Sequence, residues 1–241
     1  MMLTCTNVVK DFGGVRALAG VTVSVQEGEI LGLVGPNGSG KSTLINTITG
    51  QYVPTEGTIQ FMGQDIDGKP PHLITHMGIA RTYQIPRPFR TMTVRENVEI
   101  STLFGTTQGI SQREAAAESM RWLAFTGLAK YADVPVVKLT LHQRKFLELS
   151  RALATHPRLL LLDEVMAGLN PSEIDESVQM IRKVHDSGVT IVIVEHLMRV
   201  VTSLSMRMAV LDQGKLIAEG EPEAVMQDAL VVSAYLGKDY A

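Results

Sequence analysis

The chain has 241 residues, 45% of them hydrophobic and 20% charged, and its formal net charge is −3. A chain of this length and composition can bury a substantial core, as one large domain or two small ones. The charge balance lacks the basic excess typical of proteins that coat DNA or RNA, so no nucleic-acid partner is expected. Cys5 is the one cysteine, which excludes an intrachain disulfide and suits a reducing compartment.

Neither a membrane span nor a secretory signal is predicted. No apolar run approaches the roughly 20 residues that cross a bilayer. The N-terminal residues lack a basic stretch followed by a long apolar one, which a secretory signal requires. We therefore expect a cytoplasmic protein, for which any role at a membrane comes through a partner.

The N-terminal part favours short strands. Leu3–Val9 and Ala17–Val25 have strand-like patterns, with a turn at Gly13-Gly14 between them. Glu29–Val34 is an apolar run that leads into a glycine-rich turn, after which apolar residues recur at helical spacing. A hairpin over Thr58–Asp65 is expected to close this first lobe.

The middle and the C-terminal half differ in character. Helix formers dominate from about residue 90 to 154, and Ser111 with Glu114 has the pattern of a helix cap. Beyond that stretch, strand-like runs alternate with helical segments, which implies a parallel α/β sheet. We expect helices at Thr93–Leu103, Gln112–Thr126, Arg144–Ala154, Pro171–Asp186 and Leu197–Leu204, and strands at Leu159–Leu162, Thr190–Val194 and Ala209–Leu211. No linker or repeat is evident, so residues 1–241 are predicted to form one domain with a helical lobe inserted at about 86–155.

The most specific pattern lies between the apolar run and the helix that follows it. It matches G-x-x-x-x-G-K-[ST] and comprises Gly35, Pro36, Asn37, Gly38, Ser39, Gly40, Lys41, Ser42 and Thr43. Glycines let the backbone curl so that N–H groups point inward at a helix N-terminus. Lys41 would supply a point charge to the β- and γ-phosphates, and Ser42 a hydroxyl ligand for Mg²⁺. The pattern predicts a nucleotide phosphate site.

An acidic pair supports this prediction. The leucine run at Leu159–Leu162 ends in Asp163 and Glu164, as a buried strand does when it delivers carboxylates to the carboxyl edge of a sheet. Ligands bind at that edge in open α/β sheets. Asp163 is expected to hold magnesium, through water, and Glu164 to polarise an attacking water molecule.

With these two motifs and the order of the remaining segments, the chain resembles the ATPase subunits of ABC transporters over essentially its full length. It is most similar to the ATPases of branched-chain amino acid importers, because of Arg151–Pro157 before the leucine run and a C-terminal extension at about 217–241 that contains Ala234–Gly237. The resemblance implies a P-loop NTPase (RecA-like) core sheet with an N-terminal antiparallel β lobe and an inserted helical lobe. It also implies that ATP hydrolysis energises the uptake of amino acids or similar small solutes.

The resemblance assigns roles to residues outside the two motifs. Phe12 stands where the family stacks an aromatic ring on adenine, although a core position in a strand would also explain it. Gln84 matches the glutamine that contacts magnesium and reports to the membrane subunit, and His196 matches the histidine that contacts the γ-phosphate. Ala167–Pro171 resembles the loop that crosses between paired subunits, in which Asn170 also suits a helix N-cap.

In the family, two subunits sandwich two ATP molecules, each held by one phosphate loop and the opposing subunit's signature. The signature here is Leu139–Gln143, in which Thr140, His142 and Gln143 are expected to meet the partner's nucleotide. His142 replaces a glycine, and we expect its side chain to obstruct the close approach of backbone to phosphate. One hypothesis is a heterodimer with a related ATPase of ordinary signature. Tolerated drift, and a regulatory cassette that binds ATP with little hydrolysis, are the alternatives.

The resemblance implies a catalytic set of Glu164, His196 and Gln84 and a magnesium set of Ser42, Gln84 and Asp163. It implies transmembrane subunits docked near the Gln84 loop, a second ATPase subunit and, indirectly, a periplasmic solute-binding protein. The chain would then lie at the cytoplasmic face of the inner membrane.

An ABC ATPase of DNA repair or translation would need a long coiled-coil insertion or two tandem cassettes. A P-loop kinase would lack the signature, His196 and the crossing loop.

Overall fold

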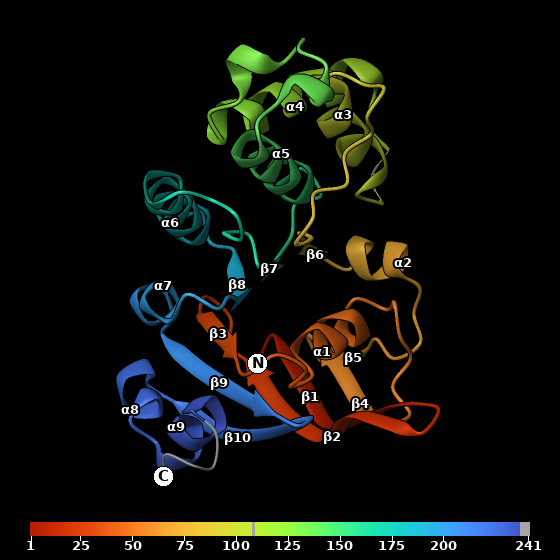
Figure 1. Cartoon of the computed structure of the whole chain (residues 1–241). Helices are drawn as coiled ribbons and strands as arrows, with labels where there is room; N and C mark the ends of the chain where they lie inside the picture. Colours follow the sequence, from red (N-terminus) through yellow and green to blue (C-terminus); the bar gives the residue numbers. More distant parts are fainter. Residues whose placement is uncertain (108, 237–241) are drawn as a thin grey trace.

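The computed structural model describes residues 1–107 and 109–236, which form two sheets (Figure 1). The N-terminal sheet is antiparallel with strand order β2-β1-β4-β5. In the second sheet the order is β10-β9-β3-β8-β7-β6, where neighbours from β9 to β6 run parallel and β10 is antiparallel to β9. The predicted α/β fold, a parallel core sheet beside an antiparallel β lobe, is confirmed. The strands are β1 (Leu3–Phe12), β2 (Val15–Val25), β3 (Ile30–Val34), β4 (Glu56–Phe61), β5 (Gln64–Asp65), β6 (Ile79–Arg81), β7 (Leu159–Asp163), β8 (Thr190–Val194), β9 (Arg207–Asp212) and β10 (Lys215–Gly220).

The helices fall into two groups. Figure 1 shows α3, α4 and α5 together at one end of the molecule, where α5 also packs against the core sheet. This group comprises α3 (Val94–Phe104), α4 (Gln112–Phe125), the short 3₁₀ helices η1 (Ala129–Tyr131) and η2 (Val136–Lys138), and α5 (Leu141–Leu153). The others are α1 (Lys41–Ile48), α2 (Pro71–His76), α6 (Pro171–Asp186), α7 (Met198–Leu204), α8 (Pro222–Met226) and α9 (Ala229–Leu236).

The core strands are apolar at nearly every position because both faces of the parallel sheet are covered. Along β7, Leu159 and Leu161 join a cluster that includes side chains of the antiparallel sheet. The alternate residues, Leu160 and Leu162, pack instead with side chains of α5 and α6. This period of two is the ordinary alternation of a strand. The helices α3, α4 and α5 share a separate apolar cluster, which includes Val94, Val98, Leu123 and Leu147.

Capping boxes start four of the helices. The N-caps are Thr93, Ser111, Thr140 and Asn170, and each is bonded reciprocally to the residue three positions later. The predicted caps at Ser111 and Asn170 are therefore confirmed. The predicted start of a helix at Arg144 is wrong, because the Thr140 cap places the first turn of α5 at Leu141.

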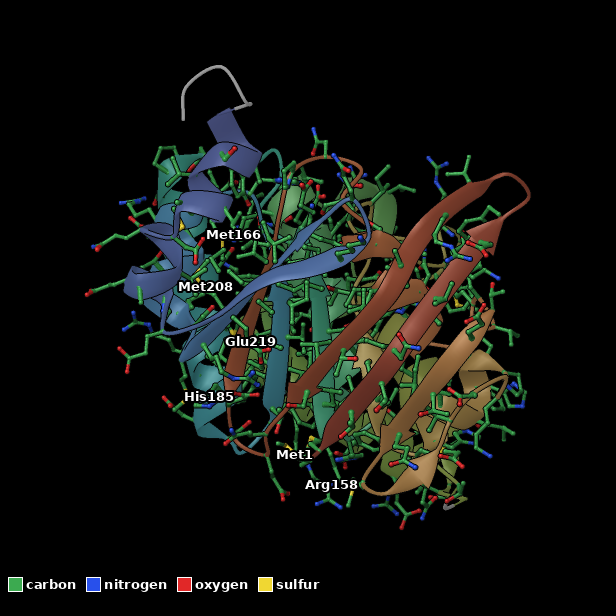
Figure 2. All side chains as sticks on the ribbon, turned by 90° about the horizontal axis from the view of Figure 1, so that it is seen from below. Met1, Arg158, Met166, His185, Met208 and Glu219 are labelled. Carbon is green, nitrogen blue, oxygen red and sulfur yellow. The ribbon has the colours of Figure 1, made fainter. Side chains whose placement is uncertain are left out.

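Several short elements were not predicted. The strand β6 has three residues, and β10 is an edge strand with mostly half-buried side chains, so neither has a strong hydrophobic pattern. In Figure 2 the blue β9–β10 ribbon lies beside the red strands of the N-terminal sheet. The Ala19 N–H donates to the Gly214 carbonyl oxygen over 2.8 Å, which joins β2 to the turn between β9 and β10. Among the residues described, no helix has both the length and the apolar character needed to cross a bilayer.

Candidate active site

The phosphate loop follows β3 and ends at α1, as its sequence predicts. Gly35 has φ of +147°, and a Cβ atom there would lie 2.0 Å from the Leu211 carbonyl oxygen. Gly40 has φ of +107°, and its Cβ atom would lie 2.8 Å from the Ala17 carbonyl oxygen. Both positions therefore require glycine. Gly40 provides no side-chain cap for α1, so the first N–H groups of this helix are free of such a bond and suit an anion.

Lys41 is held inside the phosphate loop. Its side chain is buried, with 5% of the residue exposed. The Nζ atom donates to the carbonyl oxygens of Gly35 and Pro36 over 2.8 Å and 3.0 Å, and lies 3.4 Å from the Ser39 hydroxyl. Burial lowers the pKa of Lys41, while the carboxylates of Glu164 and Asp163 oppose that change. The oxygen atoms of the loop thus orient the ammonium.

Two residues that lie far apart in the sequence, Gln84 and His196, meet at Glu164. The Gln84 Nε2 atom donates to Glu164 Oε2 over 2.5 Å, and the His196 Nε2 atom lies 3.0 Å from Glu164 Oε1. A cavity of about 170 Å³ lies between this group and the phosphate loop, and it is lined by Ala17, Asn37, Gly38, Ser39, Gly40, Lys41, Ser42, Thr43, Glu164 and His196. A carboxylate and an imidazole therefore face the loop that suits phosphate.

Asp163 has a partner that sequence reasoning missed. At the end of β6, Arg81 donates from Nη2 to Asp163 Oδ2 over 3.0 Å and from Nη1 to Asn46 Oδ1 over 2.6 Å. Burial raises the pKa of Asp163, and the Arg81 guanidinium opposes this shift. Arg81 thereby joins β6, β7 and α1 beneath the phosphate loop. The only signal in the sequence is a charged residue directly after the apolar pair Ile79-Ala80.

The oxygen atoms near the phosphate loop fit magnesium. Mg²⁺ prefers oxygen ligands and keeps several waters, using one or two protein groups together with substrate phosphates. Ser42 lies exposed in the first turn of α1, and Asp163 Oδ1 accepts no hydrogen bond from the described residues. Gln84 bonds Glu164 through its amide nitrogen, which leaves its amide oxygen available. The described residues hold no cluster of three or more His, Cys, Asp or Glu side chains suited to a metal.

Comparisons with known proteins decide the family. The model of the ABC transporter family matches residues 18–167. This chain belongs to the ABC transporter family. A second family model, that of the branched-chain amino acid ATP-binding cassette transporter, matches residues 215–241, most of which lie in the predicted C-terminal extension.

Relatives of this cassette are similar over nearly their full length. It is 37% identical to the high-affinity branched-chain amino acid transport ATP-binding protein BraF of Pseudomonas aeruginosa, over 98% of each chain. It superposes with a TM-score of 0.89 on the ADP conformation of the ATP-binding cassette MJ1267, at 35% identity, over 98% of this chain and 99% of that one. A dimeric post-hydrolysis structure of the cassette MJ0796 with ADP and Pi gives a TM-score of 0.82 at 26% identity, over 92% of this chain and 99% of that one.

Phe12 lies outside the ten residues that line the phosphate cavity. It ends β1 with 42% of the residue exposed, so the alternative that it is a core residue is wrong. Its ring meets the edge of Tyr52 with centroids 5.0 Å apart, and Lys10 Nζ lies 5.1 Å from its centroid. An exposed ring in this place remains available for stacking.

We expect Phe12→Ala to raise the dissociation constant for ATP about five- to hundredfold, because stacking of an aromatic ring on a base is worth about 1–3 kcal/mol. Equilibrium titration with a fluorescent ATP analogue measures this change. The matched control is Phe104→Ala, which removes an exposed phenylalanine from the helical lobe. Equal affinities in Phe12→Ala and wild type would show that the ring is structural.

The signature residues also lie outside the phosphate cavity of their own chain. Thr140 Oγ1 accepts the Gln143 N–H over 3.2 Å, and Gln143 Oε1 accepts the Thr140 N–H over 3.0 Å. The His142 ring is turned toward Phe146, at 4.3 Å between centroids, with Nε2 3.8 Å from a Glu176 carboxylate oxygen. Only 12% of the His142 side chain is exposed. The structure therefore differs from the expectation that this side chain obstructs a partner.

We expect His142→Gly to lower the melting temperature with little change in ATP turnover of the assembled complex. The variant loses the ring contact with Phe146 and places glycine in a helix, at a cost of about 1 kcal/mol. Thermal unfolding and phosphate release measure the two effects. A clear rise in turnover that depends on the phosphate-loop lysine of a partner ATPase would instead support the asymmetric heterodimer.

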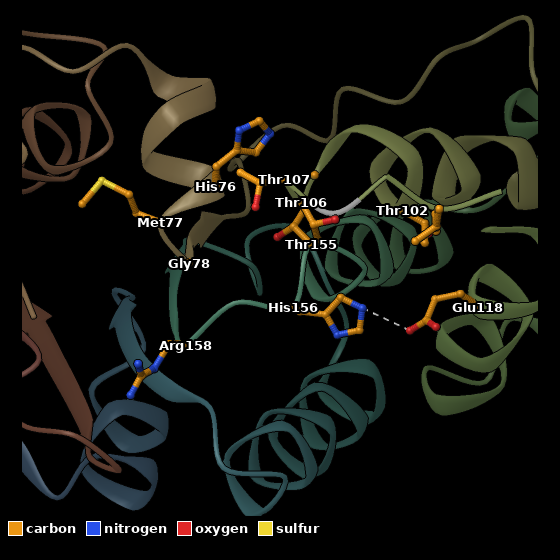
Figure 3. A pocket seen from close by; sticks show the side chains of 12 residues that line it. His76, Met77, Gly78, Thr102, Thr106, Thr107, Glu118, Thr155, His156 and Arg158 are labelled. Atoms are coloured by element: carbon orange, nitrogen blue, oxygen red, sulfur yellow. Dashed lines mark ion pairs between the residues drawn. The ribbon is translucent and has the colours of Figure 1, made fainter. Parts of the chain in front are cut away.

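A second cavity, of about 460 Å³, lies where the helical lobe meets the core (Figure 3). His156 follows α5 and faces Glu118 of α4, with Nε2 3.2 Å from the carboxylate. On the core side, His76 Nε2 lies 3.0 Å from the Phe104 carbonyl oxygen at the end of α3. None of the residues predicted for nucleotide binding lines this cavity, so it is separate from the phosphate site.

Proposed function

We propose that this cassette binds and hydrolyses ATP to energise an importer of branched-chain amino acids or similar small solutes. The proposal rests on one observation: a single cavity beside the phosphate loop is lined by Lys41, Ser42, Glu164 and His196. The similarity to BraF and the family match over residues 215–241 support the choice of substrate class.

The geometry suggests a separate role for each residue of the site. The Lys41 ammonium and the N–H groups of the loop hold the phosphates, and Ser42, Asp163 and Gln84 would hold Mg²⁺, which neutralises phosphate charge when bound. Glu164 accepts a proton from the attacking water as it approaches the γ-phosphate. His196 keeps the Glu164 carboxylate in place and lines the cavity beside the phosphate loop. Gln84 joins this group to the loop that leads to the helical lobe.

The partners proposed are a second cassette, identical or related, and transmembrane subunits. A dimer would bring Thr140 and the backbone of His142 and Gln143 to the partner's nucleotide, and a dimeric structure of the similar cassette MJ0796 supports this arrangement. Next to the Gln84 loop lies a groove of about 520 Å³ lined by Pro86, Arg87, Pro88, Arg90, Val136, Val137 and Arg144. Ile85 beside it is 73% exposed. We place the transmembrane subunit there, with the periplasmic solute-binding protein on the far side of the membrane.

Uptake in cells tests the proposal. Deleting the gene should abolish high-affinity uptake of radiolabelled leucine, and the wild-type chain, but not its Glu164→Gln variant, should restore it. The cassette should also co-purify with transmembrane subunits and release phosphate from ATP. Unchanged uptake after deletion would contradict the substrate class. Tight ATP binding without phosphate release from the assembled complex would favour the regulatory alternative.

A further inference from the structure

The helix α5 carries three ionisable side chains along one face. Lys145, Glu148 and Arg151 are spaced three residues apart, so they are neighbours on the helix surface. Lys145 and Glu148 are buried, each with 6% of the residue exposed. Residues of these types are almost never fully buried unless paired. The contacts of these three side chains therefore indicate which parts of the protein α5 holds together.

Two of the three side chains hold the main chain of Arg87, three residues after Gln84. The Arg87 N–H donates to Glu148 Oε2 over 3.3 Å, and Arg151 Nη1 donates to the Arg87 carbonyl oxygen over 2.9 Å. Arg151 also pairs with Glu148 over 3.2 Å. This pair fixes α5 to the loop that contains Gln84.

Lys145 instead reaches the acidic end of β7. Its Nζ atom donates to the backbone carbonyl oxygen of Glu164 over 3.2 Å. The nearby Glu195, 3% exposed, accepts the Met166 N–H over 2.8 Å. Burial lowers the pKa of Lys145, and the carboxylates of Glu195 and Glu164 oppose this shift. The segment after β7 is thus held from the helical lobe at Glu164 and from β8 at Met166.

The backbone of Glu164 needs such support. Its φ is +49°, in the left-handed region that non-glycine residues avoid. Conformations of this kind persist only where surrounding contacts determine them. Because the side-chain direction follows from φ, a rotation of this residue would move the carboxylate away from Gln84 and His196.

We propose that Lys145 is a positioning residue that holds Glu164 in its working conformation from the signature helix. The inference rests on the proposed role of Glu164 as the base. Since α5 begins at Leu141, directly after Thr140, the same helix presents the signature to the partner's nucleotide and holds the base of its own site. A buried lysine could otherwise serve only to neutralise Glu195, and the experiment has to separate these two roles.

The first experiment measures steady-state ATP hydrolysis by the assembled transporter that carries Lys145→Met. We expect kcat to fall about ten- to hundredfold, as misplaced catalytic groups do, with unchanged affinity for ATP. Lys138→Met, in the same lobe, is the control for loss of an exposed lysine and should leave kcat unchanged. If removing one charge prevents folding, Lys145→Met with Glu195→Gln removes both charges and keeps an acceptor for Met166. A role confined to charge balance predicts that this double variant regains wild-type kcat, which would overturn the proposal.

The decisive experiment is a double-mutant cycle that combines Lys145→Met with Glu164→Gln. If Lys145 acts through Glu164, the lysine change should cause no further loss of single-turnover hydrolysis in the Glu164→Gln background. Equal losses in both backgrounds would overturn the proposal and leave the base role of Glu164 intact. Wild-type turnover in Glu164→Gln alone would remove the base role itself, so the two failures are distinguishable.

Discussion

Replacing Glu164 with glutamine is expected to lower ATP turnover of the assembled transporter about 100- to 10,000-fold, the range of general-base assistance. The amide has the shape of the carboxylate, and its oxygen still accepts the Gln84 amide hydrogen, whereas its NH₂ group replaces the acceptor oxygen that lies 3.0 Å from His196 Nε2. It cannot take a proton from water, so ATP should stay bound and the closed dimer should accumulate. Phosphate release and size-exclusion chromatography with ATP measure the two effects.

The control for this change is Glu223→Gln, which neutralises an exposed carboxylate in α8 that does not line the phosphate cavity. It should leave turnover and dimer formation as in wild type. Wild-type phosphate release by Glu164→Gln would exclude Glu164 as the base and would direct attention to His196. Loss of ATP binding in Glu164→Gln would mean that the variant disturbs the phosphate loop rather than the chemistry.

The fold and the phosphate loop could be predicted because their signals are local. The loop is contiguous, and its glycines at 35 and 40 are required by close approaches of backbone oxygen atoms. The α6 helix (Pro171–Asp186) and the β8 strand (Thr190–Val194) match their predicted bounds, since a capping box with Pro171 starts one and a purely apolar run defines the other. In each case neighbouring residues in the sequence determine the structure.

The contacts that organise the site could not be predicted, because they join residues far apart in the chain. Arg81 meets Asp163 across two strands, and β6 is too short to have a hydrophobic pattern. In the sequence, Lys145 has the pattern of a solvent-exposed helix residue. Its contact with Glu164 at the end of β7 exists only in the folded chain. The orientation of His142 is likewise set in the folded chain, where its ring packs on Phe146 of α5 and faces Glu176 of α6. Composition and spacing carry no information on such pairings.

Lys41→Ala is expected to raise the dissociation constant for ATP about ten- to hundredfold or more, since a hydrogen bond to a charged phosphate contributes about 1.5–3 kcal/mol. The structure shows what the Lys41→Ala variant loses. The ammonium lies inside the loop, 2.8 Å and 3.0 Å from the carbonyl oxygens of Gly35 and Pro36, and no other lysine or arginine among the described residues lines the cavity. Titration with ATP and Mg²⁺ by calorimetry measures the loss.

A folding defect could imitate this result, because Lys41 also holds the loop's own carbonyl oxygens. Thermal unfolding without nucleotide separates the two causes. Lost contacts to phosphate leave the melting temperature of Lys41→Ala close to that of wild type and remove most of the stabilisation that saturating ATP provides. A collapsed loop would instead lower the melting temperature before ATP is added. Lys215→Ala, at an exposed position on β10, should match wild type in both measurements. Unchanged ATP affinity in Lys41→Ala would contradict the assignment of this lysine to the phosphates.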